Sequence, residues 1–420
     1  MENHEDPGGK GLAVSLYLHI PFCTGKCGYC DFYSMPLASL DPGERDLLTG
    51  NYTEVLLNET KRRFDGLCGQ IRGSLAVPTV YIGGGTPSIL GAAGISRFLK
   101  GLGDILGSLE GEGGPAERRE ISVEANPETA DPSFLRACAD YGVTRLSLGI
   151  QSFNGPSRRA AGRQGETELL PRVLAEVAEI FGAGLSLDLI SGLPEQDEPV
   201  LLRDIEKSLS FGPGHISLYA LTVEEGTPLA SQIRGRSGKK PALPPADEAD
   251  RLWIAGRDAL IRAGYEQYEV SSFARTAGTG TCRCLHNIRY WRMENWIGTG
   301  PGASGTIISG KGRGRRFVYA SDVEAFMTAE KIPVQTKELD RNDVMRETLL
   351  MGFRYTGGPG GALFQKRFGQ SLEETIPRTL EKWNTLLRPG ETALTGEGLL
   401  FLNPFLLDAF AELDNSKTCP

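Results

Sequence analysis

Six short apolar segments, spaced far enough apart for a helix between each pair, constrain the fold of this chain more than any other feature. They read SLYLHI, TVYI, ISVEA, RLSLGI, LSLDLI and HISLYAL, and they lie between residues 15 and 221. Strands that alternate with helix-length connections are typical of a parallel sheet. Their nearly continuous apolar character predicts strands that are covered on both faces. LLPRVLAEVAEI, at residues 169–180, has the pattern of a connecting helix. The sequence therefore predicts an α/β fold.

Polar residues follow these segments where each predicted strand ends. The first segment leads into three cysteines, the second into a triple glycine, and the fifth contains an aspartate. Apart from the cysteines, the residues in or after the ends of these segments are Gly83, Gly84, Gly85, Thr86, Glu124, Asn126, Gln151, Asp188 and Thr222. In parallel α/β barrels and doubly wound sheets, the carboxyl ends of the strands carry the active site. We therefore expect these residues to meet at one rim of the sheet.

Three cysteines, Cys23, Cys27 and Cys30, lie within eight residues directly after the first predicted strand. Iron–sulfur cubanes are ordinarily held by four thiolates, so three cysteines leave one iron open to another ligand. A structural zinc site would normally have four protein ligands. His19 is the nearby candidate for a fourth, but on an extended strand it points the same way as Tyr17. The spacing favours a 4Fe-4S cluster and leaves zinc as the alternative.

The composition is that of an ordinary globular protein, with 420 residues, 40% of them hydrophobic and 23% charged. No stretch approaches the roughly 18 uninterrupted apolar residues of a membrane span. The acidic start, MENHEDPGGKGLAV, resembles neither a secretory signal nor a transit peptide, so we expect a cytoplasmic protein with no integral membrane segment. Eight sparse, clustered cysteines indicate metal binding or redox chemistry rather than a disulfide scaffold. The net charge of -8 argues against a nucleic-acid partner.

The strand rhythm ends near residue 235, where the proline-rich, charged stretch GRSGKKPALPPADEAD begins. We expect a flexible N-terminus at 1–14, a barrel core at 15–235, a flanking region at 236–334 and a C-terminal domain at 335–420. In the last range, RNDVMRETLLMGF, GALFQKRFGQSLEETI and GLLFLNP have the order helix, helix and β-wing, which predicts a small winged-helix-like α+β domain. This range carries 10 Lys and Arg against 12 Asp and Glu, so it offers no basic stripe for DNA. A structural or lid role is the interpretation we favour.

The cysteine stretch CTGKCGYC resembles the signature of the radical S-adenosylmethionine (SAM) superfamily. The resemblance implies an incomplete (β/α)6-type barrel and a 4Fe-4S cluster on Cys23, Cys27 and Cys30, with the amino and carboxylate groups of SAM on the fourth iron. It also implies that the reduced cluster cleaves SAM to a 5'-deoxyadenosyl radical. The tasks of the protein are then to bind and orient the cofactors and to exclude competing reactions.

Six segments, LYLHIPFC, GGGTPS, EANPE, RLSLGIQSFN, LDLISGLPEQ and HNIRYW, are similar, in the same order, to the oxygen-independent coproporphyrinogen III dehydrogenase group (HemN) and to its heme-chaperone relatives (HemW). By this resemblance the SAM contacts are Tyr17, Tyr29, Gly84, Gly85, Thr86, Glu124, Gln151, Arg163, Asp188 and Thr222. From the residues alone, the triple glycine could be an ordinary βα turn, Glu124 a surface salt-bridge residue and Arg163 a solvated helix charge.

Three features separate the branches of this group. The dehydrogenase pattern has a fourth cysteine where this chain has Phe32, and it has a longer segment before the first strand, whereas 14 residues precede Ser15 here. Both departures resemble the heme-chaperone branch. The third feature is HNIRYW, which is similar to the motif proposed to hold heme in that branch. Histidine is an established heme ligand, and Tyr290 and Trp291 could pack against a flat macrocycle, so we predict that His286 binds heme. The alternative is a buried histidine in an aromatic cluster.

Two further positions remain open. Cys282, Cys284 and His286 alternate, which is compatible with a second metal or a heme–thiol contact, but the preceding TAGTGT makes a disordered loop our expectation. The family commonly has a histidine two residues after the equivalent of Arg163, and this chain has Gly165 there. Any role of that histidine therefore does not transfer to this chain.

The sequence as a whole predicts a radical SAM protein that acts as a heme chaperone, with heme and heme-acceptor proteins as its partners and a monomer or weak dimer as its assembly. Whether it also cleaves SAM as an enzyme is left open. The alternative is an oxygen-independent coproporphyrinogen III dehydrogenase, which decarboxylates propionates to vinyl groups. A non-catalytic zinc-binding protein is a third interpretation, which the SAM-like rim disfavours.

Overall fold

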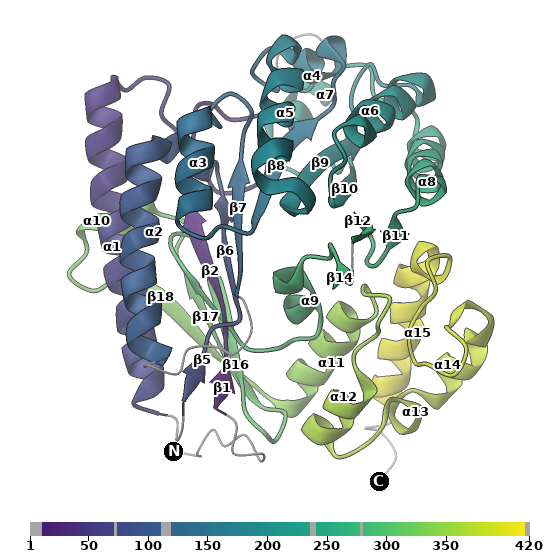
Figure 1. Ribbon diagram of the computed structural model, residues 1–420. Coiled ribbons are helices and arrows are strands. Elements are labelled where there is room, and N and C mark those ends of the chain that lie inside the picture. The colour runs from purple at the N-terminus through teal and green to yellow at the C-terminus, as the bar shows by residue number, and fades with distance from the viewer. Residues whose placement is uncertain (1–10, 71–73, 111–118, 236–240, 278–279, 416–420) are drawn as a thin grey trace.

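One twelve-stranded sheet forms the centre of the molecule (Figure 1). The structure is a computed structural model, and it describes residues 11–70, 74–110, 119–235, 241–277 and 280–415. Neighbouring strands follow the order β11-β12-β10-β9-β8-β7-β6-β2-β15-β16-β17-β18. The six strands in the middle are parallel: β2 (Ser15–Ile20), β6 (Thr79–Gly84), β7 (Glu120–Ala125), β8 (Arg145–Gln151), β9 (Leu185–Ser191) and β10 (His215–Ala220). They are the six predicted segments in chain order, so the α/β prediction is confirmed.

The parallel strands form an incomplete barrel because β2 and β10 do not pair with each other. Beside β2 lies β15 (Trp296–Thr299), which is parallel to it and is followed by the antiparallel strands β16 (Ser304–Ile308), β17 (Gly314–Tyr319) and β18 (Val334–Leu339). Beside β10 lie β12 (Ser272–Ala274) and β11 (Glu266–Gln267), both antiparallel to their neighbours. The region after residue 235 therefore extends the sheet at both edges.

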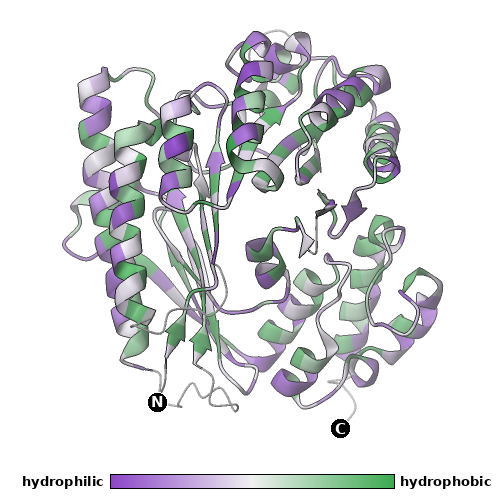
Figure 2. Cartoon of the chain, in the orientation of Figure 1, coloured by the Kyte–Doolittle hydropathy of each residue, from purple (hydrophilic) through white to green (hydrophobic). Residues whose placement is uncertain are grey.

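Helices cover the outer face of the parallel strands (Figure 1). They are α1 (Pro42–Cys68), α2 (Gly91–Glu110), α3 (Pro132–Asp140), α5 (Leu170–Phe181), α6 (Glu198–Ser210) and α8 (Ala246–Arg262). The short helices α4 (Gly155–Ala160) and α7 (Pro228–Ile233) lie beyond the carboxyl ends of the strands (Figure 1). Asp41, Asp131 and Asp197 cap α1, α3 and α6, each accepting a hydrogen bond from a first-turn amide. Their apolar faces join one core with the strands, and Figure 2 shows the hydrophilic residues of these helices alternating with hydrophobic ones. No helix within the described ranges is long and apolar enough to cross a membrane.

The C-terminal part is mostly helical and has a hydrophobic core of its own. Its helices are α11 (Arg341–Gly352), α12 (Gly361–Phe368), α13 (Leu372–Thr375), α14 (Pro377–Lys382) and α15 (Leu402–Asn415). The short helix α10 (Val323–Thr328) instead packs against α1 and joins the core of the barrel. The two predicted helical stretches are helical, but the expected boundary at residue 335 falls inside β18, a strand of the central sheet. The predicted β-wing is wrong, because GLLFLNP forms a 3-10 helix (Gly398–Phe401) and the start of α15. Leu402, Phe405 and Ala409 are buried at helical spacing, which a short apolar run did not reveal.

Two shorter regions also differ from the expectation. Leu12–Ala13 forms strand β1, parallel to β5 (Leu75–Ala76), so ordered structure begins before Ser15; residues 1–10 lie outside the described part. The expected disordered loop around residues 276–286 is wrong for its described residues. There β13 (Thr276–Ala277) pairs with β14 (Gly280–Thr281), and α9 (Leu285–Trp291) follows.

Candidate functional site

A cavity of about 460 Å³ opens at the carboxyl ends of the parallel strands, beside the cysteine loop. It brings together eleven of the fourteen predicted site residues. They are Cys23, Cys27, Tyr29, Cys30, Gly84, Gly85, Thr86, Glu124, Gln151, Arg163 and Asp188. The cavity also contains Phe32, Asn126, Ser147, Tyr219 and Glu224. The carboxyl rim thus carries one shared site, as the strand-end pattern predicts.

The cysteine loop is held against the segment after α4. The Gly28 amide donates to the Ala161 carbonyl at 3.0 Å, and a Cβ atom on Gly28 would lie only 2.7 Å from that oxygen. Glycine is therefore needed at this close approach. The strand β3 (Phe22–Cys23) pairs with β4 (Met35–Pro36) and closes the base of the loop. Burial raises the pKa of the Cys23 and Cys30 thiols, so without a metal centre these groups stay protonated at neutral pH.

The arrangement of the three thiols fits a cluster better than a single ion. Among the residues that the structure describes, no group of three or more His, Cys, Asp or Glu side chains is spaced to hold one metal ion. Thiolates of a cubane each bind a different iron, so they need not converge on one point. The candidate fourth zinc ligand is also engaged: His19 Nδ1 lies 2.9 Å from the Tyr17 hydroxyl, and its Nε2 lies 3.1 Å from the Tyr33 carbonyl oxygen. The geometry therefore disfavours the zinc alternative.

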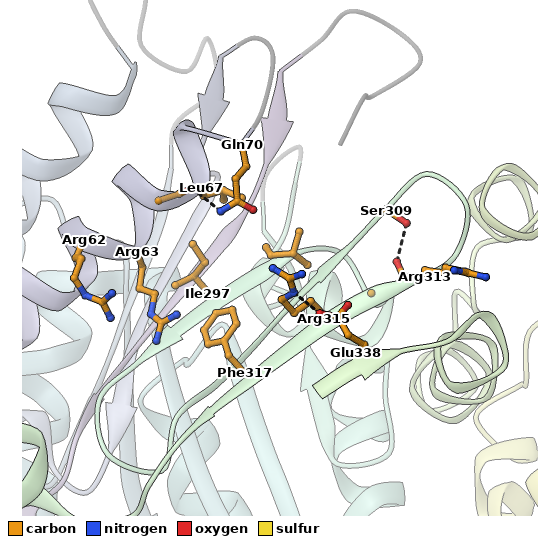
Figure 3. A pocket seen from close by; sticks show the side chains of 13 residues that line it. Arg62, Arg63, Leu67, Gln70, Ile297, Ser309, Arg313, Arg315, Phe317 and Glu338 are labelled. Atoms are coloured by element: carbon orange, nitrogen blue, oxygen red, sulfur yellow. Dashed lines mark hydrogen bonds and ion pairs between the residues drawn. The ribbon is translucent and has the colours of Figure 1, made fainter. Parts of the chain in front are cut away.

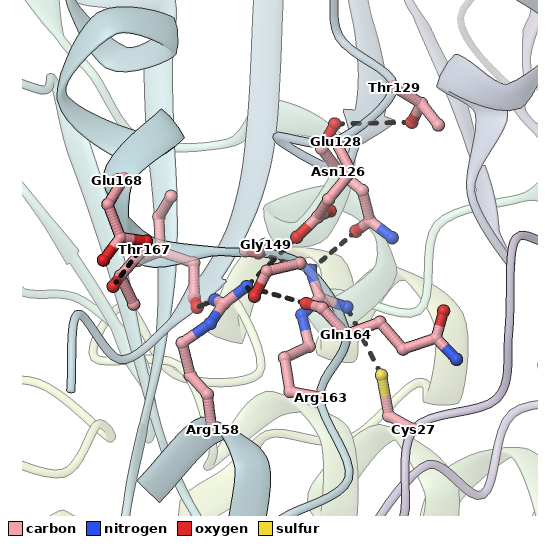
Figure 4. Close-up of polar contacts among 12 residues, drawn as sticks. Cys27, Asn126, Glu128, Thr129, Gly149, Arg158, Arg163, Gln164, Thr167 and Glu168 are labelled. Carbon is pink, nitrogen blue, oxygen red and sulfur yellow. Dashed lines mark hydrogen bonds and ion pairs between the residues drawn. The ribbon is translucent and has the colours of Figure 1, made fainter. Parts of the chain in front are cut away.

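Arg163 reaches into the cavity beside the loop (Figure 4). Its guanidinium donates to Cys27 Sγ at 3.4 Å, to Asn126 Oδ1 at 3.0 Å and to the Gly149 carbonyl at 2.7 Å. Asn126 Nδ2 donates to Thr86 Oγ1 at 3.0 Å, and Thr86 Oγ1 lies 3.4 Å from Cys23 Sγ. The guanidinium head is therefore not a solvated helix charge, which was the alternative interpretation. This network joins two of the three thiols.

One buried donor beside the thiols has no partner among the described residues. Arg163 Nε is buried and has no hydrogen-bond partner among the described residues. A buried N–H without a partner costs free energy, so a bound acceptor such as a carboxylate would be stabilised there. Cys23, Cys27 and Cys30 are all free thiols. The residues present thus fit a cluster on the three thiolates with an amino-acid carboxylate beside Arg163.

The glycine-rich turn after β6 shapes one wall. Gly84 has a φ of 113°, and a Cβ atom there would lie 2.4 Å from the His19 ring. Its amide donates to Glu124 Oε2 at 3.0 Å, and the Tyr81 hydroxyl donates to Glu124 Oε1 at 2.8 Å. Burial raises the pKa of Glu124 to about 7, although these two hydrogen bonds lower it. Glu124 is an acceptor inside the cavity rather than a surface salt-bridge residue.

Asp188 lies in the middle of β9, and Gln151 is the last residue of β8. Burial raises the pKa of Asp188, and the hydroxyls of Ser217 and Ser147 oppose that effect. Ser147 Oγ donates to Asp188 Oδ2 at 3.0 Å. Gln151 has a φ of 67° and follows a register shift in the β8–β9 pairing. A positive φ at a residue other than glycine is strained, and such strain commonly occurs where a side chain is aimed into a ligand site.

Three predicted residues do not line the cavity. Tyr17 lies deeper in the barrel, where its ring stacks on Tyr81 at a centroid distance of 6.2 Å. Thr222 is exposed beyond the end of β10, and Tyr219 lines the cavity from that strand instead. His286 is buried on α9 beside Thr79, the first residue of β6, and so lies at the opposite end of the parallel strands. The structure therefore separates His286 from the cysteine rim.

The structure also shows the surroundings of Cys284 and Gly165, the two positions that the sequence left open. Cys284 caps the start of α9 and is buried, and its thiol lies 3.6 Å from Glu120 Oε1. Burial raises the pKa of Cys284 to about 12, so without a metal ion it is a neutral thiol at neutral pH. Gly165 has a φ of 85°, and a Cβ atom there would lie 1.8 Å from Glu128. The positive φ at this position disfavours a histidine, and any side chain there would require the Glu128 carboxylate to move.

Sequence reasoning did not identify several residues that build the site. Asn126 was seen only as a strand-end residue, yet it connects Arg163 with Thr86. Buried Arg158 pairs with Glu128 at 3.0 Å and donates to the carbonyl of Gln164, which fixes the segment that carries Arg163 (Figure 4). Arginine and glutamate in a polar segment give no local signal of burial. The serines inside β8 and β9 did give a signal of burial in the sequence, because polar residues alternate with apolar ones along these strands.

A second cavity, of about 500 Å³, contains none of the predicted residues. It lies between the C-terminal half of α1 and strands β15 to β18 (Figure 3). Arg63 and Arg315 line it, and their charges are offset by Glu59 and Glu338, at 2.9 Å and 2.6 Å. It holds no thiol among its lining residues. The chemistry therefore concentrates at the carboxyl rim.

The fold and the rim define the class of this protein: an incomplete α/β barrel that carries a three-cysteine loop beside a polar cavity. The radical SAM superfamily matches residues 17–205. The heme chaperone HemW of Synechocystis sp. is 30% identical over 96% of this chain and 98% of its own, and that of Escherichia coli is 32% identical over 81% and 82%. The mitochondrial radical S-adenosyl methionine domain-containing protein 1 of Mus musculus is 30% identical over 98% and 90%.

Among solved structures, the coproporphyrinogen III oxidase HemN of Escherichia coli has the same fold, with a TM-score of 0.73 and 18% identity over 96% of this chain and 91% of that one. The chain therefore belongs to the radical SAM superfamily and, within it, to the HemW family. Membership of the superfamily implies a 4Fe-4S cluster and SAM as cofactors.

Proposed function

We propose that this chain is a heme chaperone, which binds heme and passes it to acceptor proteins and which carries a 4Fe-4S cluster with SAM at the barrel rim. The near full-length similarity to proteins named heme chaperones supports this function. The cluster needs free thiols, which persist in a reducing compartment, so we place the protein in the cytoplasm. We further propose that it is a monomer or weak dimer. Heme is the cargo in this proposal, and the cluster and SAM are the resident cofactors.

At the rim, the chain's own groups divide the binding of SAM among them. Cys23, Cys27 and Cys30 would hold the cluster, and when bound, the cluster and SAM would supply one-electron chemistry. Arg163 offers its unpaired Nε to a carboxylate. Glu124 and Asp188 offer carboxylate oxygens to the hydroxyls of a ribose, and such hydrogen bonds to a charged acceptor are strong.

The observation that carries the heme assignment is the hydrogen bond of His286 Nδ1 with Thr79. The Thr79 hydroxyl donates to Ser15 Oγ at 2.9 Å, so its oxygen accepts from His286 Nδ1, which lies 3.1 Å away. A proton fixed on Nδ1 leaves the Nε2 lone pair available, and a neutral imidazole in this form is a metal ligand. Burial lowers the pKa of His286 to about 3, so the ring is neutral at physiological pH. Because only 6% of His286 is exposed, heme binding requires α9 to move.

Phe32 supports the chaperone over the dehydrogenase. This residue lines the rim cavity and is 69% exposed, and it stands where the dehydrogenase pattern has a fourth cysteine. An aromatic side chain at that position offers an apolar surface and no thiol. Coproporphyrinogen carries no metal. An enzyme that decarboxylates it would therefore have no use for a histidine that can bind the iron of heme.

One sample tests the two functions together. We expect the anaerobically reconstituted protein to bind about one heme per chain, as one iron-ligating histidine predicts, and to leave coproporphyrinogen III unchanged when SAM is present. His286→Ala should lose or shift the Soret band while keeping the cluster spectrum, and added imidazole should restore the band. Leu285→Ala, which changes an exposed neighbour on α9, is the control and should bind heme normally. Robust decarboxylation together with heme binding that is indifferent to His286 would overturn the proposal in favour of the enzyme.

A further inference from the structure

A continuous chain of buried hydrogen bonds runs through the barrel interior from the rim to α9. It starts at Asp188 in the cavity and passes through Ser147 Oγ at 3.0 Å to Ser186 Oγ at 3.2 Å. Ser186 Oγ lies 2.9 Å from His215 Nδ1, and His215 Nε2 lies 2.8 Å from the Tyr268 hydroxyl. Ser186, His215 and Tyr268 belong neither to the cofactor site nor to the heme motif, and each is at most 2% exposed.

The far end of the chain is the start of α9. The Cys284 amide donates to the Tyr268 hydroxyl oxygen at 3.1 Å. Beside it, the Glu120 carboxylate accepts from the amides of Leu285 and His286, at 3.0 and 2.9 Å. These bonds satisfy the free N–H groups of the first turn. The chain of hydrogen bonds therefore ends on the backbone that positions His286.

The chemistry of the members identifies most donors of the chain. A backbone N–H can only donate, so the Tyr268 oxygen accepts from Cys284, and the Tyr268 hydroxyl gives its own proton to His215 Nε2. Burial holds the pKa of His215 well below its usual range, so the ring is neutral and its Nδ1–H donates to Ser186. Ser147 Oγ is the donor to both Asp188 and Ser186, and its single proton can serve only one of them at a time. The Ser147 proton is therefore shared between the Asp188 carboxylate in the cavity and the Ser186 oxygen on the side of α9.

A second contact links the same two ends of the barrel. The Tyr81 hydroxyl donates to Glu124 in the cavity, and the Tyr81 ring lies 5.2 Å from the His286 ring, centroid to centroid. Glu124 and Asp188, two of the acidic residues that line the cavity, are thus both connected to the segment that carries His286. Buried networks of this kind have few alternative arrangements, because each unmade hydrogen bond in the interior is costly.

We propose that Ser186, His215 and Tyr268 are positioning residues that couple occupancy of the rim cavity at Asp188 to the position of the α9 N-terminus. The inference rests on the proposed function for the identity of the ligands. Ligand hydroxyls that donate to Asp188 compete with Ser147 for the carboxylate. The displaced Ser147 proton then turns to Ser186 Oγ, where it competes with His215 Nδ1, and the change passes through Tyr268 to the hydrogen bond that holds the Cys284 amide. By linkage, displacement of α9 changes the affinity of the cavity by the same factor.

Hydrogen–deuterium exchange of the reconstituted protein, with and without SAM, tests the coupling without heme. In wild-type protein, SAM should change the exchange rate of the amides at 284–286 by about fivefold or more. Ser186→Ala breaks the chain of hydrogen bonds in its middle and touches neither end, so the response should fall to within about twofold of no change. SAM affinity in this variant, measured by calorimetry, should stay close to wild type because Ser147 still bonds to Asp188.

Ser122→Ala is the matched control, because Ser122 is an equally buried strand serine of the interior whose hydroxyl has no partner among the described residues. It should keep the wild-type response. Tyr268→Phe removes a different member of the chain and should lose the response too, which guards against a local effect of Ser186. An unchanged response in Ser186→Ala and Tyr268→Phe, or no response in SAM-bound wild-type protein, would overturn the coupling. Absence of SAM binding to wild-type protein would refute the SAM part of the proposed function, and this inference with it. Absence of heme binding alone would refute only the heme part.

Discussion

Replacing Glu124 by glutamine should stabilise the cofactor-free protein above pH 7 by about 3 kcal/mol and should alter its stability little near pH 4.5. Burial is the largest cause that raises the pKa of Glu124 from 4.5 to about 7, and the charge of Asp188 adds to it. At 1.36 kcal/mol per pH unit, this difference corresponds to about 3 kcal/mol. Glutamine can keep both hydrogen bonds, since its oxygen accepts from the Gly84 amide while its NH₂ group donates to the Tyr81 oxygen.

The sign follows from proton linkage. A carboxyl group whose pKa is higher in the folded protein binds more protons there than in the unfolded chain between the two pKa values. The stabilisation is fully present below the unfolded pKa of about 4.3 and is lost as the pH rises through about 7. Glutamine does not titrate, so the difference between variant and wild type should grow over this pH window and stay constant above it.

Urea unfolding of both proteins at pH 5 and pH 8, with a thiol reductant and no iron, measures this difference. Glu54→Gln, on the exposed side of α1, is the control and should stay within about 0.5 kcal/mol of wild type at both pH values. A difference between Glu124→Gln and wild type that is the same at pH 5 and pH 8 would refute the buried-carboxylate reasoning. The same burial explains why a ribose would bind there, because its hydroxyls would offset the desolvation of the carboxylate.

Two further predictions concern the walls of the cavity. Changing Cys23, Cys27 or Cys30 to alanine should abolish the reconstituted 4Fe-4S absorption, whereas Cys138→Ala, which removes a buried thiol away from the cavity, should spare it; a normal spectrum in all three loop variants would contradict the assignment. Gly84→Ala should lower the unfolding free energy by roughly 1–3 kcal/mol and weaken SAM binding in calorimetry, because the residue has a positive φ and a methyl group would strike the His19 ring; wild-type values for both would show that the turn can relax.

The parallel half of the fold could be predicted from sequence because each strand is a local signal. SLYLHI matches β2 residue for residue, and the other five segments agree with their strands within two residues at either end. The shared rim followed from topology alone, since parallel strands end on one side. The flanking strands were not predicted, because β15 to β18 are short and join the sheet only through the pairing of β15 with β2, in which Trp296 lies opposite Ser15. The helical start of α15 was missed for a related reason, as burial against α11 and α14 decides its conformation.

The residues that form the interior chain of hydrogen bonds could also be found in the sequence. That they bond to one another follows only from the curvature of the sheet, which buries them. Along the parallel strands most alternate residues are polar or aromatic, as in Arg145 and Ser147 of β8, Ser186 and Asp188 of β9, and His215 of β10, while the intervening leucines and isoleucines pack under the helices. We expected nearly continuous apolar strands, and the alternation shows instead one apolar face and one polar face. An open sheet would expose such a polar face to water. Curvature of the six strands, together with α9 bound to Glu120 and Thr79 at their amino ends, buries it, and buried polar groups must then bond to one another. The polar lumen therefore connects the two ends of the barrel for a physical reason, independent of which ligand occupies either end.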